Sequence, residues 1–288
     1  MGNADWFKVH PSWCGEIMTD SVGKSTREKL EDACTSANDL TLKIGACSEK
    51  AVVRKAQYTA KLEATEKTIK ELESLIAQGF DKELSETCKS RCRQQWIEYT
   101  TGRTKEIHTK YFDKGILMED KAIMMLSKLD SEFYDKNLET FYHHPFIEGT
   151  PDIINHEKVI DVKCSWDIFN FFKVKFTKLD KGYMYQLQCY MELLRQRYPK
   201  LEDAELCYCL MNTPEHIKLA EIKKQEWRTG EFVALSDKEY AQLEKNHNFD
   251  DMPDEKKVIR FSIKRDDAII EAIEKRVIEC RKYIETLS

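Results

Sequence analysis

Long apolar runs, glycine and proline are all scarce in this sequence, and each scarcity excludes a class of protein. No stretch approaches the ~20 apolar residues that a membrane helix requires, and no apolar run follows a basic N-terminus, so we expect neither a membrane span nor a secretory signal. The 288 residues include only 10 Gly and 6 Pro, whereas 41% are hydrophobic. The chain is therefore not collagen-like or wholly disordered, and its length suits one large domain or two small ones.

Ten cysteines are present, but their scattered positions do not resemble a disulfide framework. Several of them, such as Cys189, Cys207 and Cys209, lie within apolar runs, where cysteine behaves as a small hydrophobic residue. We therefore expect a reducing, cytoplasmic environment. Cys88 and Cys92 lie four residues apart on one face of an expected helix, which leaves a zinc or iron–sulfur site open. No second CxxC-type pair lies at a useful distance from them.

The formal net charge of −5 does not by itself identify a partner. Proteins that bind nucleic acids are often basic, yet an acidic protein can present a basic groove, and an acidic metal site adds negative charge of its own. Nucleic-acid binding is therefore neither indicated nor excluded by charge.

Residues 49–78 carry the strongest helical pattern in the first half of the chain. They contain neither Pro nor Gly, and Gly79 directly after them is suited to end a helix. Apolar positions recur at steps of three and four, which is typical of a heptad seam. The seam consists of Tyr58, Leu62, Thr65, Ile69, Leu72 and Ile76. We expect a second helix over about 82–110 and an antiparallel hairpin between the two. Residues 21–112 as a whole are then a helical, coiled-coil-like insertion, whose simplest role is that of a scaffold arm.

From residue 115 onward, helical and strand patterns alternate. The sequence predicts helices over 116–130, 181–197 and 265–286, and strands over 146–149, 152–154, 158–164, 204–212 and 256–263. This order predicts an α/β (α+β) core made of residues 1–20 and 113–288.

Two carboxylates and a lysine are expected to converge on the second and third of these strands. A tight turn over 155–157 would place the strands side by side, with Asp152 near the start of one and Asp161 near the end of the other. Asp161 and Lys163 point to the same face because strand side chains alternate, whereas Val162 points to the other. Clustered carboxylates repel one another without a cation, and oxygen ligands of this kind suit Mg²⁺ or Mn²⁺.

Two carboxylates hold such a cation incompletely, and the preceding helix offers a third. Glu119 follows Gly115 by four residues and is the preferred candidate, although the adjacent Asp120 is an alternative. A lysine beside a metal can position or deprotonate a water molecule. Together these residues are suited to metal-assisted hydrolysis of a phosphodiester.

Four motifs occur in an order that resembles a known enzyme family. They are Gly-x-x-x-Glu (115–119), Gly-x-Pro-Asp (149–152), Asp-x-Lys (161–163) and Gln-x-x-x-Tyr (186–190). This arrangement resembles the PD-(D/E)xK nucleases of the RecB and phage-lambda exonuclease type, as do the segments HPSWCGEIM, IDVKCSW and YQLQCYM. The resemblance covers residues 8–20 and 115–195, and 21–112 have no counterpart. It implies a restriction-endonuclease-like core, with a central mixed sheet flanked by helices and the helical hairpin inserted.

The resemblance also implies roles for individual residues at the catalytic centre. Glu119, Asp152 and Asp161 would hold Mg²⁺ or Mn²⁺ together with the backbone carbonyl of Val162. Lys163 would orient or activate the attacking water.

Further residues are implied to contact or support DNA. Gln186 would lie over the site and touch Lys163 or the DNA, with Tyr190 one turn on as its support. Ser12 and Thr150 match hydroxyls that help to hold a DNA 5′-phosphate, for which Lys8 or His10 is the nearest basic partner. Trp166 begins an aromatic cluster that belongs to the core or stacks on bases at a frayed end.

The function implied by the resemblance is that of a metal-dependent DNA exonuclease, acting 5′ to 3′ on double-stranded ends. It further implies phage-type recombination beside a single-strand annealing protein, possible ring-shaped homo-oligomers, and a location in the bacterial host cytoplasm without a membrane. Two alternatives stay open. One is a structure-specific or iron–sulfur nuclease of the same superfamily, and the other is a non-catalytic DNA-binding or coiled-coil interaction module.

Overall fold

The computed structural model describes residues 4–21, 23–77, 84–106, 109–155, 157–227 and 231–287, which belong to two compact units. The first unit comprises Met1–Ala4, Glu16–Trp96 and Ile278–Ser288, and the second comprises Asp5–Gly15 and Ile97–Val277. These boundaries differ from the expected division into 1–20 with 113–288 and 21–112. The segment from Ile97 groups with the second unit, and the segment from Ile278 groups with the first. Within the described ranges, no helix is long and apolar enough to cross a membrane.

The helical elements are η1 (Pro11–Trp13), α1 (Cys14–Ile17), α2 (Thr26–Gly45), α3 (Val52–Ala77), α4 (Glu86–Thr101), α5 (Lys110–Asp130), α6 (Ile168–Phe176), α7 (Lys181–Leu194), α8 (Glu215–Glu226), α9 (Asp237–His247), η2 (Asp254–Lys256) and α10 (Asp267–Glu285). The strands are β1 (Ile153–Ile154), β2 (Lys158–Cys164), β3 (Asp203–Cys209) and β4 (Val258–Lys264). Helices α6, α8 and α9 were not predicted. Residues 146–149, expected as a strand, form only the isolated bridges Val9–Ile147 and Phe141–Gly149.

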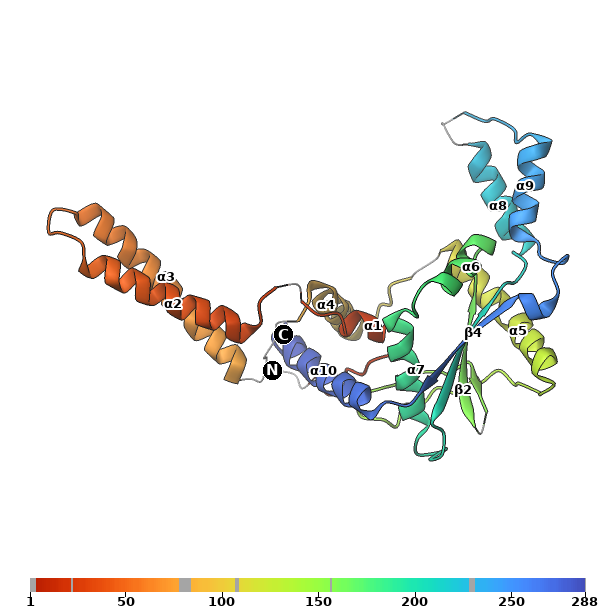
Figure 1. Cartoon of the computed structure of the whole chain (residues 1–288), viewed down its shortest axis with the longest axis horizontal. Coiled ribbons are helices and arrows are strands. Elements are labelled where there is room, and N and C mark those ends of the chain that lie inside the picture. The colour runs from red at the N-terminus through yellow and green to blue at the C-terminus, as the bar shows by residue number, and fades with distance from the viewer. Residues whose placement is uncertain are drawn as a thin grey trace. The chain divides into compact units, whose positions relative to one another are not determined.

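The first unit contains an antiparallel helical hairpin made of α2 and α3 (Figure 1). The expected hairpin paired α3 with the helix that follows it instead. Helix α3 packs against α2, which begins with a capping box between Ser25 and Glu28. All six predicted seam positions of α3 are partly buried, while the rest of that helix is largely exposed. The predicted seam is therefore confirmed. The predicted pairing with residues 82–110 is wrong, because α2 supplies the complementary apolar face, including the buried Leu40.

The helix expected over about 82–110 is shorter in the structure. Helix α4 ends at Thr101 because Gly102 adopts a φ of 64°, a left-handed conformation that commonly follows the last helical residue. Helix α5 begins at Lys110, where the side chain of the capping residue Thr109 accepts a hydrogen bond from the Phe112 amide. Within the first unit, Arg91 of α4 pairs with Glu16 of α1 at 2.5 Å.

The second unit is built on a four-stranded mixed sheet in the order β1-β2-β3-β4. Strands β2 and β3 are parallel, and the other two pairs are antiparallel. Helices α6 and α7 lie in the connection between β2 and β3, as a parallel pair requires. The predicted α+β class with a mixed sheet is confirmed.

Helices cover both faces of this sheet (Figure 1). On one face, α5 contributes Ala122, Ile123 and Leu126 to a core that includes Ile160 and Val162 of β2. On the other face, α7 packs against β2 and β3 and buries a row of apolar side chains, Leu187, Met191 and Leu194. Because Asp161 alternates with Val162, its side chain points to the α7 side.

Candidate active site

The β1–β2 hairpin brings the two predicted carboxylates together. Its register pairs Ile153 with Ile160, so that Asp152 lies opposite Asp161. Asp152 Oδ2 accepts a hydrogen bond from the Val162 amide at 2.7 Å. Lys163 Nζ lies 2.6 Å from Asp161 Oδ2, which confirms that Asp161 and Lys163 share a face. The hairpin that the sequence predicted therefore brings the carboxylates of Asp152 and Asp161 close to Lys163.

The three groups perturb one another's protonation. Burial raises the pKa of Asp152 to about 7, and the negative charge of Asp161 adds to this effect against the opposing influence of Lys163. Burial acts to lower the pKa of Lys163, but the charges of Asp161 and Asp152 outweigh burial and raise that pKa above its ordinary value. Lys163 is therefore an ammonium at neutral pH, while Asp152 is poised between its two protonation states.

Glu119 on α5 reaches the same centre from the side of the sheet covered by α5. It lines a cavity of about 980 Å³ that Lys163 and Gln186 also line, and its charge contributes to the raised pKa of Asp152. The adjacent Asp120 is 75% exposed, and it shares Lys136 with Glu119 at 3.0 and 3.3 Å. Of the two carboxylates that the sequence left open, the geometry therefore selects Glu119.

Gln186 on α7 holds Asp161 from the opposite side. Its Nε2 donates to Asp161 Oδ1 at 2.9 Å and approaches Tyr190 Oη at 3.1 Å. The expected contact of Gln186 with Lys163 is thus replaced by one with Asp161. Tyr190 is one turn along the helix, where its hydroxyl accepts this hydrogen bond, and it is only 2% exposed. Gln186 thus contacts the carboxylate and Tyr190 contacts Gln186, while Lys163 lines the cavity.

The N-terminal segment reaches the cavity through Ser12. The Ser12 hydroxyl is 2.8 Å from His10 Nδ1, and the His10 side chain caps the short helix η1 by accepting from the Ser12 amide. This segment approaches the Asp152 motif closely, because a Cβ at Gly149 would lie only 2.6 Å from Pro11 Cδ. Ser12 is exposed and lines the cavity as predicted for a DNA contact.

Thr150 does not join Ser12 at the cavity lining that the structure describes. Its Oγ1 is 2.7 Å from Thr140 Oγ1, so the hydroxyl is engaged in a hydrogen bond beside the motif. Of the two hydroxyls that the resemblance implied for a 5′-phosphate, only that of Ser12 therefore lies at this cavity.

Trp166 lies at the far side of the cavity within a cluster of aromatic rings and lysines. Lys110 Nζ is 4.7 Å from the ring centroid, and Tyr111 contacts the ring edge-on at 5.1 Å. Lys114 is fully buried and donates to the Trp166 carbonyl at 2.8 Å, and burial lowers its pKa to about 8. Trp166 is partly exposed, so it forms a rim of the cavity rather than the core.

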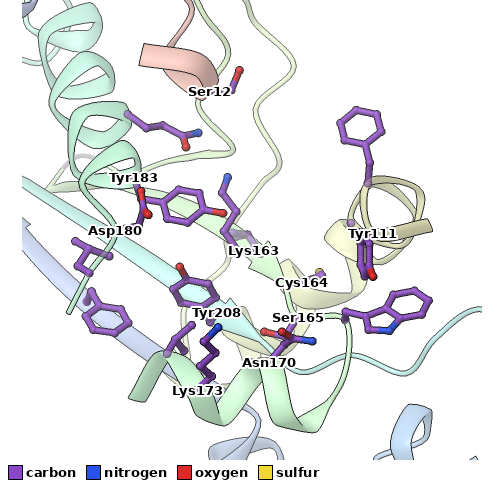
Figure 2. A pocket seen from close by; sticks show the side chains of 18 of the residues that line it. Ser12, Tyr111, Lys163, Cys164, Ser165, Asn170, Lys173, Asp180, Tyr183 and Tyr208 are labelled. Carbon is purple, nitrogen blue, oxygen red and sulfur yellow. The ribbon is translucent and has the colours of Figure 1, made fainter. Parts of the chain in front are cut away.

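Sequence reasoning missed several cavity residues (Figure 2). Tyr183 lies next to Lys163, whose Nζ is 5.5 Å from the ring centroid, and Tyr208 of β3 and Lys173 of α6 line the same wall. Tyr183 precedes Gln186 by three residues on a helix, so its shared face with Gln186 was available from spacing alone. Lys136 carries no such signal, because it lies in a loop outside every motif.

The donors at this centre fit a hard divalent cation. Glu119, Asp152 and Asp161 offer carboxylate oxygens, the ligand type that Mg²⁺ and Mn²⁺ prefer. Burial and the charge of Asp161 both disfavour the ionised form of Asp152. A cation beside Asp152 would relieve this repulsion, and Val162, whose amide is already bonded to Asp152, also lines the cavity.

Comparison with known proteins assigns the architecture. No family model and no curated protein matches the sequence. A solved structure of a phage-related exonuclease from Haemophilus somnus 129PT is 21% identical, with a TM-score of 0.59, over 99% of this chain and 98% of that one. An alkaline exonuclease from Laribacter hongkongensis is 14% identical, with a TM-score of 0.52, over 97% and 91%. The chain thus shares the fold of these two exonucleases over nearly its whole length.

Proposed function

We propose that this protein is a deoxyribonuclease, a divalent-metal-dependent exonuclease that hydrolyses phosphodiester bonds at the ends of double-stranded DNA. The observation that carries the proposal is the cluster of Asp152, Asp161 and Lys163 on the β1–β2 hairpin. Lys163 and Glu119 both line a large cavity beside this cluster. The fold, shared with two solved exonucleases over nearly the whole chain, supports the same conclusion.

The carboxylates of Glu119, Asp152 and Asp161, with the Val162 carbonyl, would hold Mg²⁺ or Mn²⁺. Such a cation would supply neutralisation of the charge that develops on the scissile phosphate. Gln186 fixes the orientation of Asp161 through the 2.9 Å hydrogen bond to Oδ1, which leaves Oδ2 directed toward Lys163. The protein thus holds its anionic groups in place before substrate binds, which reduces reorganisation during the reaction.

Lys163 performs a different task from proton abstraction. Because its pKa is raised by Asp161 and Asp152, it carries a proton at neutral pH and cannot accept another. An ammonium at this point can donate hydrogen bonds to the attacking water and to a phosphate oxygen. Of the two predicted roles, the structure supports orientation and charge stabilisation rather than activation by deprotonation.

The finer features of the proposal rest on the sequence resemblance. They are 5′-to-3′ polarity, action beside a single-strand annealing protein in phage-type recombination, and assembly into a ring. Ser12 supports a contact with a terminal phosphate because its hydroxyl lines the cavity that Lys163 faces. Lys173 of α6 and Lys178 just beyond it line this cavity, and they supply positive charge for a DNA backbone in a protein that is acidic overall.

The test is digestion of linear duplexes labelled at either end, with and without a 5′-phosphate, in Mg²⁺ and in EDTA. We expect nucleotides to be released from the 5′-labelled end in Mg²⁺ and no release in EDTA. Asp161→Asn, purified in parallel, controls for a contaminating nuclease and should bind duplex DNA without degrading it. Equal degradation by wild type and Asp161→Asn, or none by either, would favour the non-catalytic DNA-binding alternative.

A further inference from the structure

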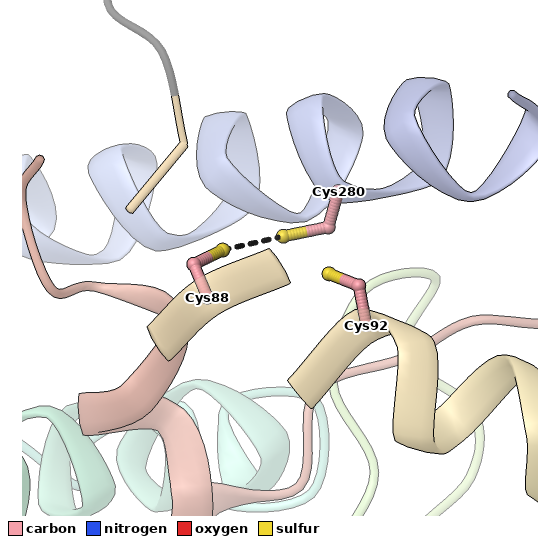
Figure 3. Close-up of side chains that lie close together, drawn as sticks. All are labelled: Cys88, Cys92 and Cys280. Carbon is pink, nitrogen blue, oxygen red and sulfur yellow. Dashed lines mark hydrogen bonds between the residues drawn. The ribbon is translucent and has the colours of Figure 1, made fainter. Parts of the chain in front are cut away.

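Two neighbouring cysteines of α4 meet a third cysteine from α10 within the first unit. Cys88 and Cys92 are four residues apart on α4, and Cys280 comes from α10 (Figure 3). All three side chains are 0% exposed. Cys88 Sγ lies 3.5 Å from Cys280 Sγ, and the three sulfurs all lie within 4.8 Å of one another. Spacing of i and i+4 on one helix places the first two on one face, and the fold adds the third.

The separation of the sulfurs suits one metal ion. Zinc binds thiolate at ~2.3 Å, so two sulfurs on a tetrahedral zinc are about 3.8 Å apart. The observed spacing therefore needs only a small adjustment to accept a single ion. An iron–sulfur cluster is commonly held by four cysteines and interposes several irons and sulfides between them, which requires thiolates that are farther apart. The geometry thus separates two alternatives that the sequence left open.

The burial of all three thiols leaves them without solvent to stabilise a negative charge. A divalent cation between them would supply that compensation, and ligation would then release the thiol protons.

We propose that Cys88, Cys92 and Cys280 form a zinc site with three sulfur ligands and a water molecule in the fourth position. The ion joins α4 to the C-terminal turns of α10, and therefore ties the end of the chain to the helical unit. This site is independent of the proposed nuclease centre, since its donors are soft sulfurs rather than carboxylate oxygens.

The described part of the chain contains a second group of possible ligands, which consists of His144, Glu192 and Glu274. This group offers nitrogen and oxygen atoms rather than sulfur. His144 Nε2 is 3.6 and 3.4 Å from the two carboxylates, and Glu192 is also bound by Arg265. Arg265 compensates the charge of Glu192 without a metal, so this group serves as a comparison in the experiment below.

The experiment uses the full-length chain, produced without a metal-binding tag and kept under reducing conditions. Metal content after dialysis should be about one zinc per chain. X-ray absorption on the wild-type protein should show sulfur neighbours at ~2.3 Å, a readout that needs no variant. Replacement of zinc by Co²⁺ should give the intense near-ultraviolet charge-transfer band of cobalt thiolates.

Matched variants locate the ion. Cys88→Ser, Cys92→Ser and Cys280→Ser should each weaken Co²⁺ binding by more than about 100-fold, since even loss of outer-shell partners costs 10–100-fold. Cys34→Ser, which changes an exposed cysteine of α2 in the same unit, should leave binding unchanged. His144→Ala and Asp161→Asn should also retain the sulfur signal, so failure of the nuclease proposal would not affect this result. Zinc with only oxygen or nitrogen neighbours, or a wild-type chain that takes up no zinc or Co²⁺ through sulfur, would overturn the proposal.

Discussion

Replacement of Lys163 is the sharpest test of how the proposed centre works. Because Lys163 is an ammonium 2.6 Å from Asp161, its side chain is expected to stabilise charge rather than accept a proton. Removing one preorganised donor from a reacting centre lowers turnover by ~10²–10³, and we expect Lys163→Ala to show a loss of this size at saturating Mg²⁺. Lys163→Arg keeps the charge on a longer, planar group, so its turnover should lie between those of Lys163→Ala and the wild type.

The cost to stability can be estimated separately. Asp161 is 1% exposed and Lys163 is 29% exposed, so the pair is buried on one side only. Breaking a fully buried pair costs ~3–5 kcal/mol, and partial exposure of Lys163 reduces this to roughly 1–2 kcal/mol. The loss should be greater in EDTA than in Mg²⁺, because a bound cation takes over the compensation of Asp161. Urea unfolding in the two buffers measures the difference.

Strand β2 provides a matched control. Lys158 pairs with Glu205 at 2.7 Å and is 30% exposed, which closely resembles the exposure of Lys163, but it lies at the other end of the strand. Lys158→Ala should therefore lose similar stability without the loss in turnover, measured by single-turnover digestion of labelled duplex. If Lys163→Ala digests DNA at close to the wild-type rate, the role assigned to Lys163 is refuted. If Lys163→Arg is as inactive as Lys163→Ala and the wild-type rate follows deprotonation of one group, Lys163 acts as a proton acceptor instead.

Three further predictions concern metal binding, packing and the helical hairpin. The Asp152 carboxyl, with its pKa of about 7, holds a proton at pH 6 that a cation must displace, so Mg²⁺ affinity should fall as pH drops below 7. Calorimetry in buffers of different ionisation enthalpy should show proton release at pH 6 and little at pH 8.5, and pH-independent affinity would contradict the reasoning. Gly149→Ala should destabilise the protein by ~1–3 kcal/mol, because the new Cβ would meet Pro11. Gly115→Ala should stabilise α5 by ~0.5–1 kcal/mol, because nothing lies within 4 Å of the new Cβ. Urea unfolding measures both changes. Replacing residues 26–77 with a short linker should leave a folded protein that binds Mg²⁺, because α2 and α3 pack against each other. Circular dichroism and calorimetry test folding and Mg²⁺ binding. An aggregated product would show that the hairpin completes the fold.

Local patterns determined the parts of this protein that lie close together in sequence. The alternation in 158–164 predicted which side chains of β2 share a face, and the short connection from Asp152 predicted a hairpin that brings Asp152 and Asp161 together. Heptad spacing likewise predicted the covered face of α3. These predictions succeed because side-chain direction follows directly from backbone periodicity, with period 2 in strands and 3.6 in helices.

Tertiary structure alone decided which distant segments meet. The sequence preferred Glu119 to the adjacent Asp120 but left both open, and only the orientation of α5 against β2 turns Glu119 to the cavity and leaves Asp120 exposed. The partner of α3 is α2 rather than the later helix, and Cys280 joins Cys88 and Cys92 across nearly two hundred residues. An amphipathic pattern shows that a face will be buried but not what will cover it, since apolar burial is non-directional and depends on the whole packing arrangement.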